Sequence, residues 1–259
     1  MNFFIGACAL VSLLGVATGS FLNCFLYRIS VNKKPEGRSY CPKCKQGLSF
    51  KDLVPLFSYI FLLGRCRYCK EKISIQYPLV ELFTGLLFLL AYIHAGLSLE
   101  LIYLFTVLFF LIFIFVYDLK HYIIPDFANF SLIGVAFLYL SLSSFFYNSV
   151  EILIFGVISA LGAFLFFFSL YYFTKGKGMG FGDVKYVVFM GFFLNYPDIL
   201  AGLFISFLLG AIIGLLLIVL KKKKAKSQVP FGPFLIAGTL IAYFYGEKLI
   251  DAYLNYALL

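Results

Sequence analysis

Residues 117–126, YDLKHYIIPD, and residues 178–185, GMGFGDVK, are the two stretches around which the chain is organised. Each places an aspartate, Asp118 or Asp183, at the edge of a long apolar run. An ionisable side chain at the end of a hydrophobic segment is costly, and by default it marks a functional site. Two of them at matched positions predict a pair of carboxyl groups at a membrane–water boundary.

The composition predicts an integral membrane protein. Of the 259 residues, 63% are hydrophobic, 20% are aromatic and only 13% are charged, whereas a soluble domain carries roughly 25% charged residues. The net charge of +9 does not indicate binding to nucleic acid. Its basic residues lie between the apolar runs, as they do in the cytoplasmic loops of membrane proteins.

Eight apolar runs predict an all-α polytopic membrane protein with about eight transmembrane helices. A span needs about 20 residues, so the seventh segment in the chain, 184–196, is short, and it could be continuous with its neighbour. The first run has no basic residue before it, so we expect a retained helix rather than a cleaved signal peptide. The runs lie at about 3–26, 78–95, 100–117, 127–147, 151–173, 184–196, 198–220 and 231–250.

The distribution of Lys and Arg predicts the orientation of these helices. With the N-terminus outside and eight spans, every Lys and Arg except Lys248 falls in or beside an inside segment, as the positive-inside rule requires. This orientation places Asp118 and Asp183 on the same face, the cytoplasmic one. The basic run Lys221–Lys224 with Lys226 is expected to anchor on anionic lipid.

A polar segment with four paired cysteines lies between the first two predicted helices. Two thiolates of each Cys-x-x-Cys turn can face one ion, so Cys41, Cys44, Cys66 and Cys69 predict a structural, zinc-ribbon-like Cys₄ zinc site. Redox-active or incidental cysteines are the alternative interpretation. The predicted parts of the chain are a first transmembrane helix at 1–27, a cytoplasmic zinc module at 28–77 and a multi-helix domain at 78–259.

The two aspartates suit the cleavage of a peptide bond. One carboxylate must be ionised to draw a proton from water, and the other must be protonated to polarise the carbonyl group. Two close carboxyl groups share a proton because both cannot ionise easily together. Glycines beside Asp183, Gly180 and Gly182, allow a peptide backbone to approach closely. We therefore interpret the chain as an integral membrane aspartyl protease.

Simpler interpretations stay open at this point. Asp183 could be only an N-cap, and Asp118 only a helix-end charge. Asp126 follows Pro125 and is expected to N-cap the next helix, although it could replace Asp118 as the catalytic residue. The protein could also be a non-enzymatic scaffold whose zinc module recruits a partner, or a transporter that relays protons. A catalytic pair requires the two carboxyl groups to lie close together.

At these residues the sequence resembles the bacterial type IV prepilin peptidases, which are aspartyl proteases of the Gly-x-Gly-Asp class. The resemblance runs from about residue 15 to residue 190, and the paired cysteines distinguish it from other proteases of that class. The positions that carry it are Gly19–Asn23, Tyr27-Arg28, the four cysteines, Ile73-Ser74, Tyr77-Pro78, Val80-Glu81, Asp118–Asp126 and Gly180–Lys185.

The resemblance implies an enzyme of the bacterial inner membrane that removes the short basic leader from prepilins and pseudopilins at the cytoplasmic face. It further implies that the new N-terminus is methylated with S-adenosylmethionine, although no Rossmann-type fingerprint is present and the residues for methyl transfer are unknown. Expected partners are these substrates and membrane lipid, and the oligomeric state is unassigned. The implied site consists of Asp118 and Asp183 as catalytic residues, with Gly180, Gly182, Pro125 and Asp126 supporting them.

Overall fold

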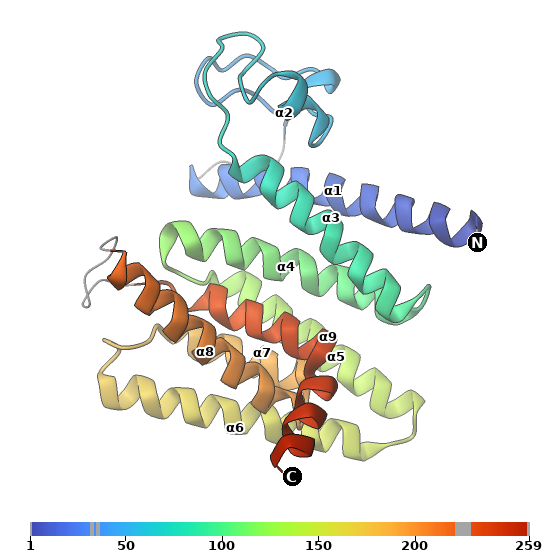
Figure 1. Cartoon of the computed structure of the whole chain (residues 1–259), viewed down its shortest axis with the longest axis vertical. Helices are drawn as coiled ribbons and strands as arrows, with labels where there is room; N and C mark the ends of the chain where they lie inside the picture. Colours follow the sequence, from blue (N-terminus) through green and yellow to red (C-terminus); the bar gives the residue numbers. More distant parts are fainter. Residues whose placement is uncertain (1, 32–33, 35–36, 221–228, 258–259) are drawn as a thin grey trace. The chain divides into compact units, whose positions relative to one another are not determined.

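The computed structural model describes residues 2–31, 34, 37–220 and 229–257. Within these residues the fold contains nine α-helices, one 3₁₀-helix and no β-strand (Figure 1), which confirms the predicted class. The basic run Lys221–Lys224 with Lys226 lies outside the described residues. The chain forms two compact units, Met1–Phe113 and Ile114–Leu259.

The helices follow the predicted apolar runs, one helix for each run. By length and composition, six described helices could cross a membrane: α1, α3, α4, α5, α6 and α8. The predicted short segment becomes α7, which has only 14 residues. The elements are α1 (Asn2–Ser30), η1 (Phe50–Asp52), α2 (Phe57–Phe61), α3 (Gln76–Ala95), α4 (Leu99–His121), α5 (Asp126–Phe146), α6 (Val150–Thr174), α7 (Phe181–Leu194), α8 (Asp198–Val219) and α9 (Gly232–Ala257).

In the first unit, α1 and α3 cross in close contact. A Cβ atom added at Gly15 would lie 2.8 Å from the carbonyl oxygen of Thr84, and one added at Gly19 would lie 2.8 Å from Cα of Glu81. The spacing Gly-x-x-x-Gly lets two helix backbones approach where lipid supplies no hydrophobic driving force between them. The two helices flank the cysteine module in the chain, and their close packing fixes the base of that module.

In the second unit, α7 lies among α5, α6, α8 and α9. Side chains on all sides of α7 are buried, including Tyr186, Val187, Phe189 and Met190. The Tyr186 hydroxyl lies 3.0 Å from Oγ1 of Thr239 on α9, so the one buried hydroxyl in this group has a partner. A short helix held on every side is a rigid support for the aspartate at its N-terminal end.

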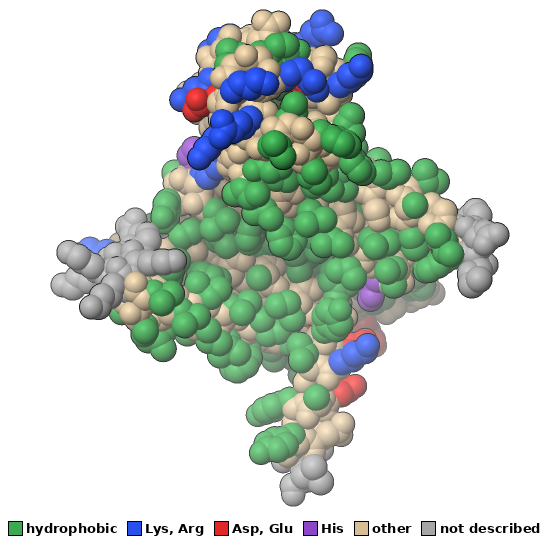
Figure 2. Space-filling model, turned by 45° about the horizontal axis from the view of Figure 1, so that its top comes forward, with side chains coloured by type: hydrophobic (Ala, Val, Ile, Leu, Met, Phe, Trp, Pro, Cys, Tyr) green, Lys and Arg blue, Asp and Glu red, His purple; other side chains and the backbone are tan. Residues whose placement is uncertain are grey.

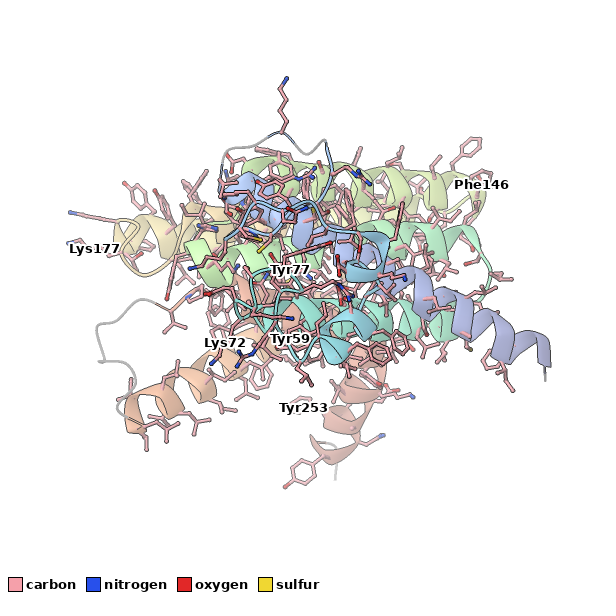
Figure 3. The ribbon with its side chains drawn as sticks, turned by 90° about the horizontal axis from the view of Figure 1, so that it is seen from above. Tyr59, Lys72, Tyr77, Phe146, Lys177 and Tyr253 are labelled. Atoms are coloured by element: carbon pink, nitrogen blue, oxygen red, sulfur yellow. The ribbon has the colours of Figure 1, made fainter. Side chains whose placement is uncertain are left out.

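Large apolar side chains cover the outer surfaces of the helices. Phe146 and Tyr253, for example, project away from the ribbon in Figure 3. A soluble protein rarely exposes apolar patches larger than a few hundred Å². The lipid hydrocarbon of a bilayer is therefore the solvent that suits these surfaces.

Candidate active site and metal centre

Asp118 lies in the last turn of α4, and the start of α9 faces it. The Asp118 side chain is only 4% exposed, and the backbone N–H of Gly232 donates a hydrogen bond to its carboxyl group. A Cβ atom added at Gly232 would lie 2.5 Å from Oδ2 of Asp118. The first N–H groups of a helix have no partner within the helix and favour negative charge. The start of α9 therefore binds this carboxyl group closely and donates a hydrogen bond to it.

Asp183 is the third residue of α7 and is also buried, at 7% exposure. Its Oδ2 accepts a hydrogen bond from the backbone N–H of Gly180 at 3.2 Å. The N-cap of α7 is therefore Gly180 and not Asp183, and Asp183 has the reciprocal capping position three residues later. Gly180 has φ −74°, so its backbone conformation does not require glycine.

The two carboxyl groups belong to one site. The charge of Asp118 acts electrostatically on Asp183. Ile124 lies between Gly182, which precedes Asp183, and Gly232, which contacts Asp118. A Cβ atom added at Gly182 would lie 3.1 Å from Cβ of Ile124, and one added at Gly232 would lie 3.2 Å from its Cδ1. Neither aspartate forms an ion pair within the described part of the chain. Two buried carboxyl groups without a cation cannot both ionise easily, so the pair is suited to share one proton.

Asp126 was expected to N-cap the helix that follows it, and this expectation is wrong. The N-cap of α5 is Pro125, and Asp126 is the first helical residue. The physical reason is that Pro125 takes the extended conformation of an N-cap, with φ −65° and ψ 130°. The carboxylate of Asp126 is 65% exposed and pairs with Lys185 of α7, so it ties α5 to α7.

Three supporting residues were not found from the sequence: Asn129, Lys185 and Gly232. Asn129 is fully buried, and its Nδ2 donates to the carbonyl oxygen of Gly182 at 3.1 Å. Its Oδ1 has no partner among the described residues. A polar residue inside an apolar run is a signal that could have identified Asn129. The sequence carries no comparable signal for Gly232.

The cysteine module brings its four thiols together. All four Sγ atoms of Cys41, Cys44, Cys66 and Cys69 lie within 4.8 Å of one another, and those of Cys41 and Cys69 are 3.9 Å apart. Tetrahedral zinc with Zn–S bonds of about 2.3 Å requires sulfur atoms roughly 3.8 Å apart. The four thiols therefore fit a structural metal, and thiolates would fill all four positions.

The two Cys-x-x-Cys turns repeat one backbone geometry. In each, the first cysteine N–H donates to a carbonyl five residues on, and an isolated bridge closes the turn: Tyr40 with Gly47, and Arg65 with Lys72. Burial would raise the pKa of the Cys41 thiol, but the N–H groups of Cys44 and Lys43 outweigh burial and lower that pKa to about 7. The first turn is thus shaped to present the Cys41 thiolate to a cation.

The fold and this site define an integral membrane protein with a paired-carboxyl site and a Cys₄ cluster. Residues 13–95 match the family model of the Bacterial Peptidase A24 N-terminal domain, and residues 105–215 match that of the Type IV leader peptidase family. The chain belongs to the type IV leader peptidase family.

Curated relatives agree with this assignment. The chain is 31% identical to the prepilin leader peptidase/N-methyltransferase of Legionella pneumophila, over 95% of this chain and 94% of that protein. It is 33% identical to the protein of the same name from Bacillus subtilis, over 85% and 87% of the two chains. A relative of that name from Pseudomonas aeruginosa is 28% identical, over 95% and 92%. No solved structure matches the chain.

Proposed function

We propose that this protein is a prepilin leader peptidase in which Asp118 and Asp183 are the catalytic carboxyl pair. Its substrates are type IV prepilins and pseudopilins, cut at the cytoplasmic face of a bacterial inner membrane. The observation that carries the proposal is the meeting of two buried carboxyl groups, from α4 and α7, without a cation. The names of the relatives support the substrate class.

Helix capping alone does not account for this arrangement. A carboxylate in the last turn of a helix meets the negative end of the helix dipole, so the position of Asp118 in α4 is unfavourable for stability. The backbone N–H of Gly232 compensates for it. An unfavourable position that another contact of the fold stabilises is typical of a functional residue.

The chemistry follows from the shared proton. The ionised carboxylate takes a proton from a water molecule as that water attacks the peptide carbonyl, and the protonated carboxyl donates to the carbonyl oxygen. Collapse of the tetrahedral intermediate breaks the C–N bond, and the pair returns a proton to the leaving amine. The titration belongs to the pair and not to either residue alone.

Two hydrogen bonds position Asp183 at the start of α7. Asn129 holds the Gly182 carbonyl from α5, and Gly180 holds the Asp183 carboxyl. Both bonds fix Asp183 from outside its own helix. We assign Asn129 a positioning role in which it acts through Gly182 and not on the substrate.

Two further parts of the proposal concern cofactors. The four cysteines would hold a zinc ion that stabilises the module and leaves no open position for catalysis. Methyl transfer from S-adenosylmethionine to the new N-terminal amine is proposed on the names of the relatives. No strand occurs among the described residues, so those residues do not form a Rossmann-type site.

Asparagine substitutions test the carboxyl pair. The purified full-length protein is incubated with a prepilin and S-adenosylmethionine, and the mass of the product is measured. Asp118→Asn and Asp183→Asn should each abolish cleavage while the protein stays folded and membrane-inserted. The matched control is Asp251→Asn, which changes an exposed aspartate of α9 and should cleave normally. Cleavage by either site variant would remove that residue from the mechanism.

A further inference from the structure

The cysteine module has an exposed apolar edge that nothing in the first unit covers. The side chains of Phe61 and Leu63 are 82% and 86% exposed, and Phe50, Phe57 and Ile60 are also exposed. The edge consists of these five residues, and it includes most of α2. Exposed apolar groups this dense are typical of a surface that contacts a membrane or a partner.

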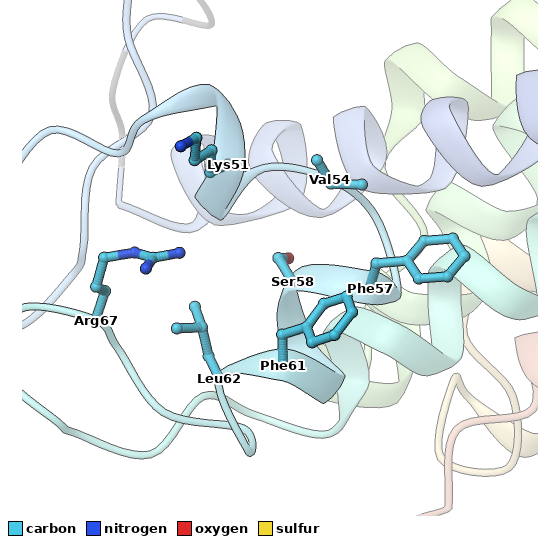
Figure 4. Close-up of a pocket in the computed structure, with 7 residues that line it drawn as sticks. All are labelled: Lys51, Val54, Phe57, Ser58, Phe61, Leu62 and Arg67. Carbon is cyan, nitrogen blue, oxygen red and sulfur yellow. The ribbon is translucent and has the colours of Figure 1, made fainter.

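An open pocket lies along this edge, with a volume of about 260 Å³. Figure 4 shows Lys51 and Arg67 at one end of it and the rings of Phe57 and Phe61 at the other. Arg67 is held in place because its Nε donates to Oδ1 of Asp52 at 2.6 Å. The pocket is lined by Lys51, Val54, Phe57, Ser58, Phe61, Leu62 and Arg67. A pocket with cations at one end and aromatic rings at the other suits an anionic amphiphile.

The edge is attached to the side of a helix that could cross the membrane. The backbone N–H of Leu56 donates to Oε2 of the buried Glu81 at 2.8 Å. Glu81 is five residues beyond the start of α3, which corresponds to about 8 Å along the helix axis. The turn that precedes α2 therefore lies alongside the first part of α3, about 8 Å from its N-terminal end.

The attachment costs the fold both strain and the burial of a carboxyl group. Leu56 has φ 61° and ψ −54°, and Phe57 N–H donates to the Pro55 carbonyl, which is the rare and strained form of a γ-turn. Glu81 has no cation partner among the described residues. Structures keep such features where the geometry they fix has a use.

The charge of the module is complementary to an anionic leaflet. Basic side chains gather over the module at the top of Figure 2. Such residues are attracted to anionic lipid at the cytoplasmic surface. The acidic residues between α1 and α3 are Glu36, Asp52 and Glu71, whereas the basic ones are Lys33, Lys34, Arg38, Lys43, Lys45, Lys51, Arg65, Arg67, Lys70 and Lys72.

We propose that the apolar edge of the cysteine module inserts into the headgroup layer of the bilayer that α1 and α3 enter, and that the pocket binds an anionic phospholipid. The lipid phosphate lies at Lys51 and Arg67, and the upper part of the acyl chains lies against Phe57 and Phe61. A basic prepilin leader suits this pocket poorly because the cations at its end would repel it. The inference depends on the membrane placement of α1 and α3 and not on the proposed function.

The experiment exploits the absence of tryptophan from the chain. Phe61→Trp places one fluorophore on the apolar edge, and Gln46→Trp places one at an exposed position of the first cysteine turn. The zinc-loaded full-length variants are reconstituted into nanodiscs whose lipids carry bromine on the acyl chains. The Phe61→Trp emission should be quenched, and the Gln46→Trp emission should not.

A second arm identifies the lipid. Bromine is placed either on the anionic lipid alone or on the neutral lipid alone, at equal mole fraction. Quenching of Phe61→Trp should be stronger with the brominated anionic lipid, and adding Lys51→Gln should lower that preference roughly fivefold, as expected for loss of a basic residue near the surface. If Phe61→Trp does not retain zinc, Ile60→Trp supplies the probe at a neighbouring exposed position.

Four results would overturn the proposal. The first is an unquenched edge probe in a zinc-loaded protein, and the second is equal quenching at Gln46. The third is equal quenching by the two lipids, which would refute the anionic headgroup site. Shielding of the edge probe only after a prepilin peptide is added would assign the surface to a protein segment and would also refute the lipid assignment.

Discussion

Replacing Gly232 by alanine should damage catalysis without unfolding the protein. The new Cβ atom would lie 2.5 Å from Oδ2 of Asp118, whereas ordinary contacts begin near 3.4 Å. The carboxyl group must therefore retreat by about 0.9 Å. The same Cβ atom would lie 3.2 Å from Cδ1 of Ile124, so shifting the start of α9 towards Ile124 does not relieve the clash.

The expected size of the effect follows from this displacement. A misplacement of about 1 Å in an active site can cost about 100-fold in rate, so we expect kcat/KM for prepilin cleavage to fall roughly 30- to 100-fold, or about 2–3 kcal/mol in the barrier. Alanine is a better helix former than glycine, and Gly232 is the first residue of α9. The thermal unfolding temperature should therefore change little.

The assay compares initial cleavage rates of a prepilin peptide by Gly232→Ala and by Gly134→Ala. Gly134 is also helical, and a Cβ atom added there meets nothing within 4 Å, so this control should keep the activity of the unaltered protein. A folded Gly232→Ala variant with full activity would refute the reasoning, because Asp118 would then not need the position that α9 gives it.

Three further predictions concern the module and the loop. Cys41→Ser should remove the bound zinc and make the module sensitive to proteolysis, whereas Cys8→Ser should keep one zinc per chain by metal analysis. Asn129→Leu should lower kcat about tenfold with KM little changed, because it removes the hydrogen bond from α5 that holds Gly182 at the start of α7, and a hydrogen bond of this kind contributes about 0.5–1.5 kcal/mol; an unchanged kcat would exclude the positioning role. Burial would raise the pKa of Asp52, but hydrogen bonds from Arg67 outweigh it and lower that pKa to about 2. Because the pKa of Asp52 is lower in the folded chain than in the unfolded chain, its ionised carboxylate stabilises the fold at pH values above about 3.8, and this contribution is lost as the pH falls towards 2. Asp52→Asn should therefore lower the unfolding temperature equally at neutral pH and at about pH 5.

The features that could be predicted from the sequence are local ones. The length of each apolar run predicts a helix directly, because every backbone N–H and C=O group inside a bilayer needs a hydrogen-bond partner within the protein. The Cys-x-x-Cys spacing likewise predicts a turn that presents two thiols. Asp118 and Asp183 stand out because each borders such a run, and the structure brings their carboxyl groups into one site.

The features that could not be predicted depend on tertiary contacts. Gly232 supports Asp118 only because α9 begins beside the end of α4, and no property of residues near Gly232 encodes that approach. The expected cap at Asp126 fails for a related reason. Pro125 already has the backbone conformation of a cap, and the Asp126 carboxylate pairs instead with Lys185, far away in the sequence.

The hydrogen bond from Gly232, at the start of α9, to Asp118 has a consequence for the synthesis of the protein. A ribosome that has released α4 and α7 into the membrane has made both acidic residues, but it has not yet made the Gly232 amide. Until that late segment enters the bilayer, the carboxyl group of Asp118 has no donor from α9 to hold it. If Asp118 and Asp183 are the catalytic pair, we therefore expect a chain that lacks α9 to cleave no prepilin.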